Sequence, residues 1–185
     1  MDVLDNKNTF ITLCKKYIKR EGITQLLDWL STSDFFEAPA SAKLHLNQRG
    51  GLCQHSLNVS KRLLELYHVT ENHNQDRIET ILIVSLFHDL CKVNYYVNKA
   101  KENHKEHYEI TKKLDILIGH GVKSARIVSR FIDITDEEYS AIVYHMGFSG
   151  DVGKPNPKII TQTFNNNELA VKLYVADTLA TFIDE

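Results

Sequence analysis

The sequence has few of the residues that interrupt helices or form cross-links. Its 185 residues include only eight glycines and three prolines, and apolar residues recur at the three- and four-residue spacing of amphipathic helices. The three cysteines, Cys14, Cys53 and Cys91, lie far apart, which excludes a CxxC zinc motif and argues against a disulfide framework. We predict an all-α protein whose cysteines are reduced and fill apolar space.

The sequence also lacks a dominant charge and a long apolar run. Lys and Arg number 22 against 24 Asp and Glu, for a net charge of −2, so phosphate recognition must be local. The longest apolar run, Ile81–Leu86, contains Ser85 and is far shorter than the roughly 20 residues that span a bilayer. The first residues do not resemble a secretory signal. These features predict a cytoplasmic protein without a membrane segment.

One segment departs from the helical pattern. Aromatic and β-branched residues on both sides of a polar run predict a small β-hairpin near residues 94–111. The segments 31–51 and 149–167 are expected to be irregular loops, and Thr135 with Glu138 forms the pattern of a helix-capping box. We expect one domain over residues 1–185, with N-terminal helices in 1–35 and a functional core in 36–185.

Histidine is unusually frequent, and one histidine is next to an aspartate. The nine histidines are about twice the usual share. A helix running to Cys91 would place Ser85, His88, Asp89 and Lys92 on one face. Alone, this pattern also fits a helix end with solvated charges.

Asp177 lies in an apolar stripe of the last predicted helix, among Leu173, Ala176 and Ala180. A carboxylate buried there needs a cation, a metal ion or several hydrogen bonds. A distant arginine such as Arg62 or Arg126 would satisfy it as well as a metal would.

Three further histidines have contexts that suit a ligand. His55 begins an amphipathic helix, His120 lies between two glycines, and His145 ends a helix. Each alone is more often a core or capping residue. The combined candidate set is His55, His88, Asp89, His120, His145 and Asp177. Such nitrogen and carboxylate ligands suit Fe, Mn, Co or Zn, and they suffice for two ions about 3.5–4 Å apart if Asp89 bridges them.

At these residues the chain resembles the HD-domain metal-dependent phosphohydrolases, whose signature order is H…HD…H…H…D. The segment Pro39–His55 is similar to the entry of the HD domain in bacterial 3′-to-5′ exoribonucleases and small phage-type HD proteins, and the segments FHDLCK, IGHGVKS and YHMG are similar to later motifs. The resemblance covers about residues 36–185. Cys53, Gln54 and Cys91 depart from the usual pattern.

The resemblance implies an HD helical bundle that holds two divalent metal ions. One ion would have His55, His88, Asp89 and Asp177 as ligands, and the other would have Asp89, His120 and His145. A hydroxide between the ions would attack phosphorus, and Asp89 and Lys92 are the expected catalytic residues. Lys92 would hold a phosphate oxygen, and His45, Lys123 and Tyr95 are further candidates for substrate contact.

The expected function is therefore hydrolysis of a phosphate ester or phosphodiester in a nucleotide or a short single-stranded oligonucleotide. The exoribonucleases carry an additional nucleic-acid-binding domain for which this sequence has no room, so a small substrate is favoured. Two alternatives remain open: a di-iron oxygenase with the same ligand pattern, and a non-catalytic nucleotide-sensing module.

Overall fold

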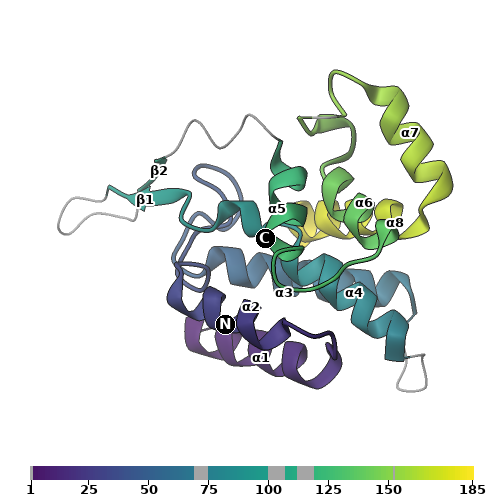
Figure 1. Cartoon of the computed structure of the whole chain (residues 1–185). Helices are drawn as coiled ribbons and strands as arrows, with labels where there is room; N and C mark the ends of the chain where they lie inside the picture. Colours follow the sequence, from purple (N-terminus) through teal and green to yellow (C-terminus); the bar gives the residue numbers. More distant parts are fainter. Residues whose placement is uncertain (1, 69–74, 100–106, 112–118, 152) are drawn as a thin grey trace.

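The computed structural model describes residues 2–68, 75–99, 107–111, 119–151 and 153–185. These residues form a body of packed helices, and a two-stranded hairpin projects from one side of it (Figure 1). The prediction of an all-α fold with a small hairpin is therefore confirmed. Within these ranges, no helix has both the length and the apolar character needed to cross a membrane.

The described elements follow one another along the chain in this order. The helices are α1 (Val3–Tyr17), α2 (Ile23–Thr32), α3 (Gly51–Leu66), α4 (Gln75–Phe87), α5 (His120–Val128), α6 (Asp136–Tyr144), α7 (Pro157–Asn166) and α8 (Glu168–Leu179). Three short turns are η1 (Leu90–Lys92), η3 (Gly147–Ser149) and η4 (Ala180–Asp184). Strands β1 (Tyr96–Asn98) and β2 (Tyr108–Ile110) pair antiparallel, with Tyr96 opposite Ile110.

One continuous apolar core joins the N-terminal helices to the rest of the body. Phe10 of α1, Leu30 of α2, Leu63 of α3, Leu82 of α4 and Leu173 of α8 are all buried in it. Helix α3 packs against α1, α4 and α8, and α6 packs against α5 and α8. The chain's last residues lie in the middle of the body (Figure 1), where η4 contacts α3.

A buried ion pair fixes the start of α6. The capping box of Thr135 and Glu138 is present, as predicted. The Glu138 carboxylate also accepts two hydrogen bonds from the Arg20 guanidinium, at 2.7 and 2.8 Å, and one from Thr80 at 2.8 Å. Glu138 is fully buried, and a buried carboxylate is stabilised only when it is paired in this way. The segment before α2 is thus joined to α4 and α6.

Two predicted helix boundaries are wrong. Helix α3 begins at Gly51 and not near His55, because Gly50, with φ 77°, turns the chain directly into the helix. Gly51 packs closely on the preceding loop, since a Cβ on it would lie 2.2 Å from the Leu46 carbonyl oxygen. Helix α4 ends at Phe87 and not at Cys91. The backbone of Asp89 leaves the helical region, with φ −110° and ψ 20°.

The predicted loop over residues 149–167 is also wrong, because it contains α7. Pro157 stands in the first turn of this helix, where its missing N–H costs nothing. Ile160 is its one buried residue in the described part of the chain. A helix with so narrow an apolar face gives little periodic signal in the sequence.

Candidate metal centre

The side chains predicted as metal ligands come from separate elements and meet at the centre of the body. His55 lies on α3 and Asp177 on α8, while His120 is the first residue of α5. His88 and Asp89 follow the end of α4, and His145 follows the end of α6. Groups of these side chains place their ligand atoms within 4.8 Å of one another. The fold thus brings the whole predicted set together.

Two of the histidines are oriented by helix ends. The Nδ1 of His88 lies 2.8 Å from the Ser85 carbonyl oxygen, and the Nδ1 of His145 lies 2.7 Å from the Ile142 carbonyl oxygen. Carbonyls in the last turn of a helix lack intrahelical partners. Because a carbonyl only accepts, Nδ1 carries the proton in both rings, and Nε2 is left as the atom that can bind a metal ion.

A carboxylate orients the third buried histidine. The Nδ1–H of His55 donates to Glu185 at 3.0 Å. Its Nε2 lies 3.2 Å from Nε2 of His88 and 3.2 Å from Oδ1 of Asp177. Two ring nitrogens at this separation repel each other unless a proton or a cation lies between them. The pairing of His and carboxylate around a metal ligand is a common feature of metalloprotein sites.

Asp89 lies between two groups of ligands. Its Oδ2 is 3.5 Å from Nε2 of His88 and 3.7 Å from Nε2 of His55. Its Oδ1 is 3.1 Å from Nε2 of His120 and 3.6 Å from Nε2 of His145. The two oxygens therefore face the two ligand sets that the family resemblance implies.

The pKa values of the cluster favour ionised aspartates. Burial by itself raises the pKa of Asp89, but the Lys92 ammonium and the nearby imidazoles outweigh burial and hold this pKa well below its usual value. The pKa of Asp177 is lowered in the same way by His55. Burial lowers the pKa of His88 to about 4, so its ring is neutral at pH 7. A neutral imidazole is the form that binds metals.

Two histidines show the opposite shift. Burial lowers the pKa of His55, but the carboxylates of Asp177 and Glu185 outweigh burial and raise it to about 9. The pKa of His120 is raised to about 10, because Cys91 and Asp89 outweigh the effect of burial. A metal ion bound here must displace these protons, so metal binding at neutral pH releases protons.

The residues fit a divalent metal ion. The Nε2 of His145 is buried and has no hydrogen-bond partner among the described residues; it lies 3.6 Å from an oxygen of Asp89. A buried polar atom is normally satisfied, and a metal ion would satisfy this one. The donors are imidazole nitrogens and carboxylate oxygens, which suit Fe, Mn, Co or Zn. The alternative partner Arg62 pairs with Glu65 and Asp184 instead of Asp177.

A cavity of about 380 Å³ opens onto the ligands. Lys92 is 7% exposed, lines this cavity, and places its Nζ 2.6 Å from Oδ2 of Asp89. His45 and Tyr96 also line the cavity. Among the described residues that line it, Tyr95 and Lys123 do not appear. The ammonium of Lys123 lies instead over the Tyr95 ring, 5.7 Å from its centroid.

Glu185 was not among the residues predicted from the sequence. Its side chain is fully buried, accepts hydrogen bonds from His55 and from Asn58 Nδ2, each at 3.0 Å, and lies 3.9 Å from Nε2 of His45. Asn58 lies one helical turn after His55 and so shares its face of α3, which was a usable signal. No apolar residues at helical spacing around Glu185 predicted that its side chain would point into the protein.

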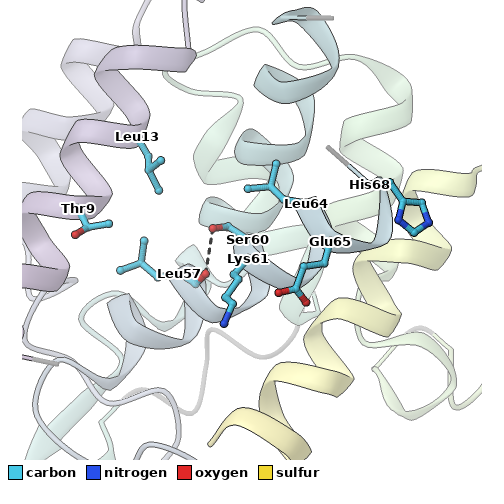
Figure 2. Close-up of a pocket in the computed structure, with 8 residues that line it drawn as sticks. All are labelled: Thr9, Leu13, Leu57, Ser60, Lys61, Leu64, Glu65 and His68. Atoms are coloured by element: carbon cyan, nitrogen blue, oxygen red, sulfur yellow. Dashed lines mark hydrogen bonds between the residues drawn. The ribbon is translucent and has the colours of Figure 1, made fainter. Parts of the chain in front are cut away.

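A second cavity lies away from these ligands. It has a volume of about 780 Å³ and is lined by α1 and α3 (Figure 2). Leu13, Leu57 and Leu64 give it a mainly apolar wall. Lys61 and His68 also line this cavity, but none of the six candidate ligands does. The smaller cavity is the candidate functional site.

Comparison with known families agrees with this geometry. The family model described as HD domain matches residues 52–181. This range is most of the chain, and it includes His55, Asp177 and the ligands between them. No curated protein and no solved structure gives a significant match.

Proposed function

The chain belongs to the HD-domain superfamily of metal-dependent phosphohydrolases, and we propose that it hydrolyses a phosphate ester or phosphodiester in a nucleotide or short oligonucleotide. One observation carries this proposal. The buried Lys92 ammonium and the convergent ligands around Asp89 line the same cavity. A phosphate group in this cavity would meet the lysine and the metal ligands at once.

The ligands can be assigned to two metal positions. His55, His88, Asp177 and Oδ2 of Asp89 would hold one ion, and His120, His145 and Oδ1 of Asp89 would hold the other, as the facing distances suggest. Divalent metals in such a pair lower the pKa of water and stabilise the negative charge that develops on a phosphoryl group. The Nδ1 hydrogen bonds of the buried histidines keep their rings in the required tautomer.

Lys92 would bind a non-bridging phosphate oxygen. Its pKa is raised because the attraction of Asp89 outweighs burial, so it stays positively charged at neutral pH. A fixed charge beside the reacting group stabilises the transition state without reorganisation. Tyr96 and His45 line the same cavity and would contact the rest of the substrate.

The size of the cavity favours a small substrate. About 380 Å³ is within the usual range for small-molecule pockets. Tyr174, Met146 and Phe182 supply an apolar part of its lining, which suits a nucleobase. The net charge of −2 gives no long-range attraction for a nucleic-acid strand.

The test combines metal analysis with a hydrolysis screen. Purified protein loaded with Mn²⁺, Co²⁺, Fe²⁺ or Zn²⁺ should approach two ions per chain and hydrolyse bis-p-nitrophenyl phosphate or nucleotides. Lys92→Ala should keep the metal, because removal of a positive charge does not weaken cation binding, and should lose about 10²–10³-fold in activity. Lys172→Ala is the matched control, since Lys172 pairs with Glu168 on the surface of α8.

Two outcomes would contradict the proposal. Full activity of the Lys92→Ala variant on every phosphate would remove Lys92 from the site. Inertness of the metal-loaded native protein toward all phosphates, together with O₂ consumption with an organic substrate, would favour the oxygenase instead.

A further inference from the structure

Cys91 lies beside one of the two groups of ligands. It is 4% exposed, and its Sγ is 4.0 Å from Oδ1 of Asp89. The Sγ of Cys91, an oxygen of Asp89 and a ring nitrogen of His120 all lie within 4.8 Å of one another. The same Asp89 oxygen is 3.1 Å from Nε2 of His120. From the sequence, this thiol was expected to fill apolar space, but Asp89 and His120 lie beside it.

The backbone holds Cys91 in this place. Its N–H donates to the Ser124 hydroxyl at 3.0 Å, and Ser124 is a fully buried residue of α5. Helix α5 begins at His120, so one contact fixes the position of Cys91 relative to that histidine. Close packing of α5 on α6 supports the arrangement, because a Cβ on Gly121 would lie 2.2 Å from the Val143 carbonyl oxygen.

A separate observation points to a ligand at this position. His145 is fully buried, and its Nε2 has no hydrogen-bond partner in the part of the chain that the structure describes, although it lies 3.6 Å from Oδ1 of Asp89. The oxygen comes from the residue that precedes η1, the sulfur from η1, and the two imidazoles from α5 and the end of α6. Donors from several elements that converge on one carboxylate oxygen are the arrangement expected of a metal site.

We infer that the Cys91 thiolate is an additional ligand of the metal ion held by Asp89, His120 and His145; the inference rests on the metal centre proposed above. The thiol loses its proton to solvent on binding, and the sulfur supplies the electron pair. Thiolate favours zinc and iron, whereas sites of oxygen ligands suit manganese and magnesium. The other group, His55, His88 and Asp177, offers nitrogen and oxygen only. The two positions would therefore prefer different metals.

Cobalt is a direct probe of this ligand. Co²⁺ added to metal-depleted native protein should produce visible bands and, in the near ultraviolet, a thiolate-to-cobalt charge-transfer band. Cys91→Ser, which keeps the size of the side chain, should retain the visible bands and lose the charge-transfer band. Cys53→Ala is the matched control, because Cys53 is buried in the apolar core, and it should retain both signals.

Zinc affinity and X-ray absorption give independent measurements. Loss of a residue that only hydrogen-bonds to a metal ligand costs about 10–100-fold in metal affinity. Loss of a direct ligand should cost no less, so Cys91→Ser should weaken Zn²⁺ binding at one of the two positions at least about tenfold. Zinc-edge absorption on native protein, which needs no variant, should show a sulfur neighbour at about 2.3 Å.

The results distinguish this inference from the metal centre on which it rests. Visible cobalt bands without a charge-transfer band in native protein, or a zinc spectrum without sulfur, would overturn the role of Cys91 and leave the centre intact. Absence of any cobalt or zinc binding to native protein would overturn both.

Discussion

The Glu185 carboxylate is expected to control the metal affinity of His55 without touching the metal. Its buried side chain accepts the Nδ1–H of His55 at 3.0 Å. Replacement by Gln keeps the shape of the side chain but removes the negative charge. The amide oxygen is then a weaker acceptor, so the imidazole becomes less basic and its orientation is less well fixed.

The size of the effect follows from the contact. Loss of such an outer hydrogen bond costs about 10–100-fold in metal affinity, which corresponds to about 1.4–2.8 kcal/mol. Asn58 also donates to this carboxylate at 3.0 Å, so the Gln side chain retains one partner. We therefore expect Glu185→Gln at the lower end of this range and Glu185→Ala at the upper end.

Isothermal titration with Zn²⁺, or competition with a chelator, measures the change. Asp184→Asn is the matched control, because it weakens the neighbouring contact to Arg62 and leaves the contact to His55 in place. A second readout is NMR titration of metal-depleted protein, where the His55 pKa of about 9 should fall in Glu185→Gln. Unchanged zinc affinity in Glu185→Gln, or an equal loss in Asp184→Asn, would refute the proposed role of Glu185.

Three further outcomes are expected. Chelation should lower the melting temperature, because metal bound only to the folded state stabilises it; equal melting temperatures after verified metal removal would contradict a ligand cluster in the core. Asp89→Ala should lose metal and hydrolysis together, by elemental analysis and activity assay, since its oxygens face both ligand groups; retention of both metals would exclude bridging. The raised pKa of His55, about 9 against 6.5, stabilises the metal-depleted fold below pH 6.5. This contribution to the free energy of unfolding should be lost as the pH rises from 6.5 to about 9, and denaturation curves recorded over this pH range would measure the loss.

The identity of the candidate site could largely be predicted from the sequence. The order of His55, the His88–Asp89 pair, His120, His145 and Asp177 indicated a metal centre before any geometry was known. Residue chemistry carries this information, because few structures require so many convergent imidazoles and carboxylates. The capping box and the hairpin were also predictable, since both depend on short-range patterns.

Local patterns failed where packing decides the structure. Periodicity extended α4 through Cys91, but the helix ends at Phe87, and only this ending allows His88 to cap the carbonyl of Ser85. Helix α7 was not predicted, because its apolar face is too narrow to give a periodic pattern in the sequence. Both errors concern segments whose conformation depends on contacts with distant parts of the chain.

The sequence by itself determined which side chains are available as ligands and that the chain is helical. Only the tertiary structure decided that Glu185 orients His55, that Cys91 lies beside Asp89 and His120, and that Tyr96 and not Tyr95 lines the cavity. Helical spacing constrains neighbours within about one turn. The contact between His55 and Glu185 joins residues 130 positions apart, and its formation depends on how α3, α8 and η4 pack together.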